Sequence, residues 1–120
     1  MVDMTNIKIS PVNSQLNNLG QTQAMLCAIN LDKIGLMEQI QLGANLNQKD
    51  FNGRTVLHFL SRADNSGDTL IWFRQKNFQN IDINALTKGN VTPLMNACKT
   101  CCTASVAQLL EMGANPFLKD

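Results

Sequence analysis

Residues 92–97 read TPLMNA and residues 109–116 read LLEMGANP, and the spacing between these two segments decides the fold. Thr92 precedes the glycine of the second segment by 21 positions. Nearer the start of the chain, Thr22 precedes Gly43 by 21 positions as well. Self-similarity at a fixed period predicts an architecture of stacked repeats, so we looked for further copies of the same pattern.

A third copy lies between the first two. Residues 50–58 read DFNGRTVLH, and Thr55 follows Thr22 by 33 positions. Thr55 and Thr92 are 37 positions apart, so the middle unit carries four extra residues. A unit of this length is too small to bury its own apolar face, and about three stacked units are the usual minimum for stability.

Each unit has the pattern of two short helices. Thr55 is a predicted N-cap, because its hydroxyl can accept a backbone N–H at the start of the apolar run that follows it. In the last unit, the i, i+3, i+4 spacing of Val106, Leu109 and Leu110 is typical of an amphipathic helix, and Gly113 is its expected stop. The leucines that we expect in the core are Leu57, Leu94 and Leu110.

These units resemble the ankyrin repeat, a motif of about 33 residues with a β-turn and two helices, marked by a T-P-L-H-x-A core. The resemblance implies an all-α solenoid of three helix-turn-helix repeats joined by β-hairpin-like loops. The expected repeats span about residues 17–49, 50–86 and 87–120, after a polar N-terminal tail of residues 1–16. The positions that match the structural motif are Thr22, Gly43, Gly53, Thr55, Leu57, His58, Thr92, Pro93, Leu94 and Gly113.

Composition narrows the class of protein and its compartment. The 120 residues carry a net charge of +1, which gives no support to a nucleic-acid or anionic-membrane partner. No apolar run reaches the roughly 18 residues of a membrane span, and the first 20 residues lack a secretory or transit signal. The four cysteines lack a secreted disulfide spacing. We therefore expect an intracellular, reducing compartment: the cytoplasm or, alternatively, an organelle such as the mitochondrion, entered without a cleaved presequence.

The sequence contains no constellation typical of an active site. His58, in its T-x-L-H context, is expected to bond backbone and the Thr55 hydroxyl rather than act as a base. Residues 98–102 read CKTCC, but structural zinc takes four ligands, usually in two spaced pairs, and only Cys27 and His58 remain. We therefore predict no enzymatic activity, no metal and no cofactor. The isolated glycines interpreted as turn residues with positive φ are Gly20, Gly53 and Gly89.

The surface is what remains for function. The resemblance implies protein binding through the hairpin tips, residues 47–54 and 84–91, and through the inner helix face. Phe51 fits equally an interface anchor and packing against a neighbouring hairpin. Trp72 and Phe78, near the extra residues of the middle unit, are a second candidate, with a core position as the alternative for Trp72. The predicted partner-binding residues are Leu26, Phe51, Asn52, Arg54, Phe59, Leu86, Lys88 and Asn96.

Three functions remain open at this stage. The first is a non-enzymatic interaction module, an accessory or scaffold subunit of a larger protein assembly, whose open C-terminal end would present apolar residues around Val106 and Leu109. The second is a soluble regulator or inhibitor that caps an enzyme such as a protein kinase, which rests on analogy of fold. The third, an enzyme using the cysteines for redox or metal chemistry, has the least support among the residues.

Overall fold

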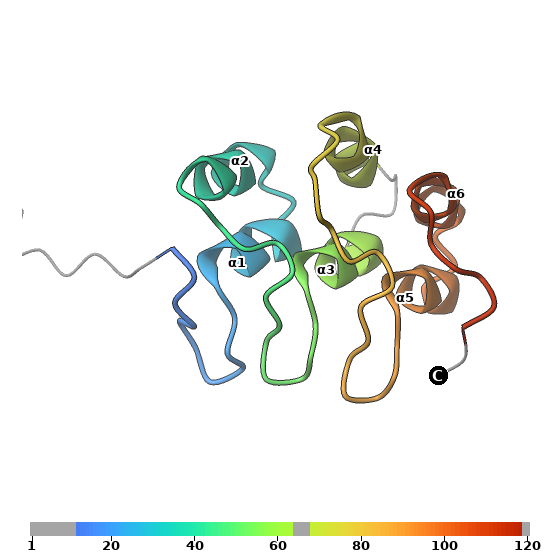
Figure 1. Cartoon of the computed structure of the whole chain (residues 1–120), viewed down its shortest axis with the longest axis horizontal. Coiled ribbons are helices and arrows are strands. Elements are labelled where there is room, and N and C mark those ends of the chain that lie inside the picture. Colours follow the sequence, from blue (N-terminus) through green and yellow to red (C-terminus); the bar gives the residue numbers. More distant parts are fainter. Residues whose placement is uncertain (1–11, 64–67, 119–120) are drawn as a thin grey trace, which may run out of the picture.

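A computed structural model of the chain describes residues 12–63 and 68–118. The described residues form six α-helices and no strand, arranged as three helix pairs (Figure 1). The inner helices are α1 (Gln23–Ile29), α3 (Val56–Ala63) and α5 (Pro93–Lys99). The outer helices are α2 (Lys33–Gln41), α4 (Asp68–Gln75) and α6 (Thr103–Glu111). The predicted all-α solenoid of three helix-turn-helix repeats is confirmed.

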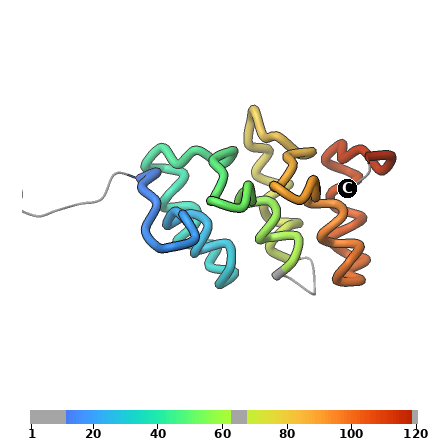
Figure 2. Tube along the Cα trace, turned by 90° about the horizontal axis from the view of Figure 1, so that it is seen from below, coloured from blue at the N-terminus to red at the C-terminus, as the bar shows by residue number. Residues whose placement is uncertain are grey.

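Three long loops project from the side of the inner helices. We call them fingers and define finger 1 as residues 13–21, finger 2 as residues 47–54 and finger 3 as residues 84–91. Each is closed by one backbone hydrogen bond between its two stems, of 2.7, 2.9 and 3.1 Å in chain order. Viewed from the finger side, the helix pairs follow one another in chain order along the long axis (Figure 2). The fingers therefore form one row beneath a layer of helices.

The inner helices begin where threonine side chains can satisfy their first backbone N–H groups. The hydroxyl of Thr22 accepts from Met25 N at 3.3 Å, and that of Thr92 accepts from Met95 N at 3.2 Å. The methionine sulfurs accept in return from the backbone N–H of the same threonines, which closes a reciprocal cap. Pro93 opens α5, where its fixed φ fits a helix and its missing N–H costs no hydrogen bond.

The core is a continuous strip along the inner layer. α3 packs against both α1 and α5, and its first five residues are all buried. The expected core leucines Leu57 and Leu94 are buried as predicted. The largest fully buried apolar side chains are Phe59, Phe73, Met25, Leu36, Leu57, Leu60, Leu70, Leu109 and Val56.

The prediction that Leu110 lies in the core is wrong. Its side chain is 44% exposed, whereas Leu109 is 0% exposed. Successive residues of a helix point about 100° apart, so the buried stripe of α6 runs through Ser105 and Leu109 and leaves Leu110 in solvent. Because Leu109 is covered and Val106 is half-buried, the expected open apolar end is not formed by these two residues.

A second correction concerns the turn of finger 3. Gly89 does not take a positive φ; the neighbouring Asn90 does, at +63°. The Asn90 N–H bonds to Thr87 O, as the Gly53 N–H bonds to Asp50 O, so Asn90 holds the place that glycine holds in finger 2. Asparagine tolerates this left-handed conformation better than most residues with a side chain. The expectation that the glycine would be the turn residue was therefore wrong in finger 3.

The four extra residues of the middle repeat are split between two places. From Thr22 to Lys33, the first residue of α2, there are 11 positions; from Thr55 to Asp68, the first residue of α4, there are 13. The remaining extra length follows α4, in residues 76–80. In that loop Phe78 packs against Phe73, with ring centroids 5.0 Å apart, and against Trp72 at 6.5 Å. Phe78 and Trp72 are thus half-buried against each other.

An asparagine ladder joins successive repeats at the base of the fingers. The side-chain oxygens of Asn13, Asn47 and Asn84 each accept a backbone N–H of the following repeat, at 2.8, 2.8 and 2.9 Å. The donors are Asn45, Asp82 and Asn115. Asn13 contacts the first repeat in this way, although the sequence predicted a tail of residues 1–16. Residues 1–11 of that tail lie outside the described residues, and the boundary itself stays a prediction.

Candidate functional site

The fingers are joined to one another through their backbones. Phe51 N donates to Leu19 O of finger 1 at 2.9 Å, and Lys88 N donates to Asn52 O of finger 2 at 2.9 Å. The Lys49 ammonium of finger 2 also donates to Leu86 O of finger 3 at 2.9 Å. These bonds fix the spacing of neighbouring tips, so side chains at the tips are held in a defined relation before any partner arrives.

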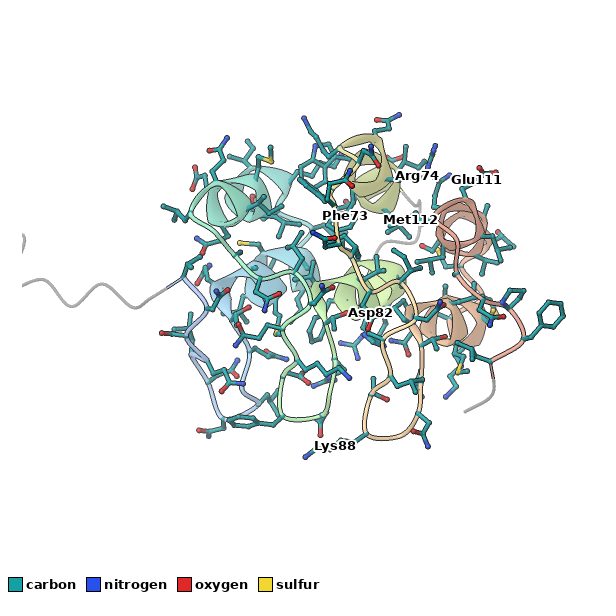
Figure 3. The ribbon with its side chains drawn as sticks, in the orientation of Figure 1. Phe73, Arg74, Asp82, Lys88, Glu111 and Met112 are labelled. Atoms are coloured by element: carbon teal, nitrogen blue, oxygen red, sulfur yellow. The ribbon has the colours of Figure 1, made fainter. Side chains whose placement is uncertain are left out.

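Four of the predicted partner-binding residues lie exposed on this row of tips. Phe51 is 51% exposed, and its other ring surface packs against the backbone of Gly20 in finger 1. Asn52, Leu86 and Lys88 are also exposed, and Lys88 points away from the tip of finger 3 (Figure 3). Phe51 thus combines both interpretations offered by the sequence: it packs on a neighbouring finger and still presents half of its surface.

The Arg54 side chain is held by contacts within its own repeat and does not extend freely from the tip of finger 2. Its Nε donates to Asp50 Oδ2 at 2.9 Å, and the Asp50 side chain is buried. The guanidinium lies 5.2 Å from the centre of the Phe59 ring, within the range of a cation–π contact. Asp50 Oδ1 also accepts from the backbone N–H groups of Asn52 and Arg54, so this carboxylate organises the turn of finger 2.

The inner helix face is less available than the sequence predicted. The prediction that Phe59 binds a partner is wrong, because its side chain is only 1% exposed. The guanidinium groups of Arg54 and Arg62, both from the same repeat, lie 5.2 and 5.7 Å from the centre of the Phe59 ring. The corresponding residues of the other repeats, Leu26 and Asn96, are half-buried and leave only part of their surface for contact.

His58 is part of the repeat interface and not of a reactive site. Its Nδ1 accepts from the Thr55 backbone N–H at 3.1 Å and lies 3.1 Å from the Thr55 hydroxyl. With Nδ1 an acceptor, the proton sits on Nε2, which donates to Val91 O of the next repeat at 2.8 Å. Both hydrogen bonds expected from the sequence are present. Burial lowers the pKa of His58 below its ordinary value, so the ring is neutral at pH 7.

The cysteines divide into two buried and two exposed thiols. Cys27 and Cys102 are buried, whereas Cys98 and Cys101 are exposed, and none is in a disulfide. Burial raises the pKa of the Cys27 thiol, which disfavours the reactive thiolate. Within residues 12–63 and 68–118, no three histidine, cysteine or acidic side chains gather in a way that could hold a metal ion.

Three of the open grooves lined by described residues follow the outer helices and the C-terminal end. The largest, about 580 Å³, lies between α4 and α6 and has Arg74 and Glu111 on its rims (Figure 3). Another, about 350 Å³, lies between α2 and α4 and is lined by Ile34 and Trp72. A third, about 460 Å³, lies beside α5. The sequence indicated the neighbourhood of Trp72, but no motif in it predicted the groove beside α5.

The comparisons agree with this geometry. No helix in the described parts of the chain is long and apolar enough to cross a membrane; the longest have nine residues. A search of curated proteins found no match to the sequence. A family model described as "Ankyrin repeats (3 copies)" matches residues 24–120, which include all of the six helices except the first residue of α1, and fingers 2 and 3. The chain therefore belongs to the ankyrin repeat family, a family of non-catalytic modules that generally mediate protein–protein interaction.

Proposed function

We propose that this protein is a non-enzymatic interaction module that serves as a small accessory or scaffold subunit of a larger protein assembly. The observation that carries the proposal is the row of three fingers, which are hydrogen-bonded to one another and carry an exposed aromatic residue. Interfaces are enriched in aromatic anchors, and an anchor already held in place loses little conformational entropy on binding.

Phe51 and Lys88 define the chemistry of the partner surface. The Phe51 ring rests on Gly20 and offers its outer half to an apolar pocket. Lys88, on the next finger, offers a positive charge close by, because its backbone N–H bonds to finger 2. The surface that fits these two groups combines an apolar pocket with an acidic rim, where charge complementarity steers the encounter.

The remaining features support the same proposal. The net charge of +1 gives no basis for a nucleic-acid partner, so the partner is a protein. The exposed thiols of Cys98 and Cys101 suit an intracellular, reducing compartment, and we assign the protein to the cytoplasm. The array also leaves apolar side chains such as Phe117 exposed, which a partner in an assembly would cover.

Co-purification of the tagged chain with and without Phe51→Ala tests the proposal. The substitution keeps the backbone bond to Leu19 and leaves the far-UV circular dichroism spectrum unchanged. We expect a protein partner to be retained by the wild type and lost by Phe51→Ala and by Lys88→Glu. Ile34→Ala, on exposed α2, is the matched control and should retain the partner.

Two outcomes would contradict the proposal. Retention of the partner by both finger variants would show that the fingers are not the interface. A purified chain that stays monomeric and stable alone, and that inhibits an enzyme it binds, would favour the alternative, a soluble regulator that caps that enzyme.

A further inference from the structure

The inner helix of the third repeat exposes a face that the first two repeats bury. The third and sixth residues after the motif threonine are His58 and Ser61 in α3, and both are buried. His58 bonds to Val91 O, so this face of α3 is turned toward the following repeat. The same positions of α5 hold Met95, which is half-buried, and Cys98, which is exposed. Neither side chain is fully covered by the described residues.

This uncovered face borders a groove of about 460 Å³. Leu94, Met95 and Cys98 of α5 form one wall, and Pro116 and Leu118 form the other. Thr92, Lys99 and Asn115 complete the lining. A terminal repeat that caps a soluble array carries polar residues on its outer face. On this face α5 instead has Leu94, Met95 and Cys98.

Two features that join successive fingers are missing at this end. A Cβ on Gly20 would lie 2.5 Å from the Phe51 ring, and one on Gly53 would lie 3.0 Å from the backbone of finger 3. Glycine at this turn position is therefore what lets the next finger approach. In finger 3 the position is held by Asn90, which has a side chain where fingers 1 and 2 have glycine.

The asparagine ladder ends at the same place. Asn47 and Asn84 occupy the second position after the residues whose backbone N–H donates to the preceding rung, Asn45 and Asp82. The equivalent position after Asn115 is Phe117, which has no side-chain acceptor for a further rung and is 86% exposed. The turn glycine and the ladder acceptor that join the earlier fingers are thus both missing here, which favours a cover of α5 that has no finger.

The first repeat shows what such a face accepts. α1 carries the same threonine–methionine cap as α5, formed by Thr22 and Met25. Met25 and Ala28, at the positions of Met95 and Cys98, are fully buried in one cluster with Val56 of α3. Because α1 and α3 pack directly together, the cover of this face is a helix. Val56 and Phe59 of α3 are both buried in this cluster. Their counterparts in α1, which no described repeat precedes, are Gln23, exposed, and Leu26, half-buried.

We infer that the uncovered face of α5 docks a single amphipathic helix of a partner protein. That helix presents two apolar side chains three residues apart, like the buried pair Val56 and Phe59 of α3, the helix that packs on α1, and it lies in the groove between α5 and residues 116–118. The inference rests on the proposed function only in requiring a protein partner, because it uses no residue of the fingers.

A synthetic helix provides the probe. The probe is a hydrocarbon-stapled peptide of about 18 residues, because unstapled helices of this length are marginal in water. Its face carries valine and phenylalanine three positions apart, and the matched control peptide carries asparagine at both. The peptides are titrated into the full-length chain labelled with ¹⁵N. We expect chemical-shift changes in α5 and residues 116–118 with the probe and none with the control.

Substitutions on the chain complete the design. Met95→Lys should weaken the probe at least tenfold, because it places a charge in the groove. Ile34→Lys, in the groove between α2 and α4, should leave the affinity unchanged. Circular dichroism of each variant excludes unfolding as the cause, and Cys98→Lys provides a second substitution of the same face.

Three outcomes would overturn the inference. The first is the absence of binding by a helical probe, and the second is binding that maps to the fingers or to the groove between α4 and α6. The third is self-association of the wild type that both Met95→Lys and Leu26→Lys abolish, since a second copy stacked head to tail would then be the occupant. Loss of a natural partner through Phe51→Ala leaves this inference untouched, so the two proposals fail separately.

Discussion

The middle and third repeats carry the same motif in two different situations. α3 is covered on both faces, and its His58 is hydrogen-bonded within the repeat and to Val91 of the next one. α5 is covered on one face only, and Met95, the counterpart of His58, borders an open groove. The motif position therefore does not determine the role of a residue. A neighbouring repeat makes it structural, and the lack of one leaves it available for binding.

The largest effect is expected for alanine substitutions of the core leucines, which should destabilise the middle repeat more than the third. Leu57→Ala should cost about 2–5 kcal/mol of unfolding free energy, because it leaves a cavity in a closed environment. Leu94→Ala should cost about 2 kcal/mol or less, because Leu94 lines the groove, where solvent can fill the space. Urea denaturation of both variants measures the difference. Equal losses would mean that α5 is as enclosed as α3.

His58→Gln should have the next largest effect. Glutamine cannot reproduce the bonds to Thr55 and Val91 together, and each is worth about 0.5–1.5 kcal/mol net. We expect a loss of about 1–3 kcal/mol, measured by the same denaturation, while the folded fraction binds its partner normally. A variant of full stability that no longer binds would place His58 in the interface instead.

The pH dependence of stability follows from the same residue. Burial lowers the pKa of His58 from its ordinary value of 6.5, so the unfolded chain binds the proton more readily than the folded one. The contribution of neutral His58 to the free energy of unfolding is therefore complete above pH 6.5. It is lost as the pH falls through the lowered pKa of the folded state. Denaturation midpoints measured across this range should decline, and the decline should be smaller in His58→Gln. An identical decline in both proteins would assign it to other groups.

The smallest effect is expected for Leu110→Ala. Its side chain is largely in solvent on α6, so truncation should change the unfolding free energy by less than about 0.5 kcal/mol. Leu109→Ala, one residue earlier, is the matched control and should be strongly destabilising. Comparable losses for the two variants would restore Leu110 to the core, as the sequence suggested.

The repeat pattern made the helices predictable because it records local chemistry. Threonine caps, the proline that opens α5 and the bonds of His58 to its own turn all lie within a few residues of one another. The choice between Leu109 and Leu110 was not settled by this information, because both fit an amphipathic spacing with Val106. Their positions depend on how α6 is rotated against α4 and α5.

The candidate site was harder to predict because it depends on neighbours. Phe59 matched an inner-face position, but its side chain is buried, with the guanidinium groups of Arg54 and Arg62 over its ring. Asn13 is bonded to the array through the asparagine ladder. It precedes its motif threonine by nine residues, whereas Asn47 and Asn84 precede theirs by eight. The sequence contains this spacing, but the prediction did not use it. The groove beside α5 has no motif of its own, since Met95 resembles the buried Met25 in sequence.

The most direct test of the contrast between the two repeats is a pair of lysine substitutions at equivalent positions. His58→Lys places a charge in a closed interface and should reduce the unfolding free energy by more than about 3 kcal/mol, enough to unfold a marginal array. Met95→Lys places the same charge at the edge of an open groove and should change the unfolding free energy by less than about 1 kcal/mol. Equal destabilisation by the two lysines, measured by urea denaturation, would contradict the conclusion that the face of α5 is uncovered.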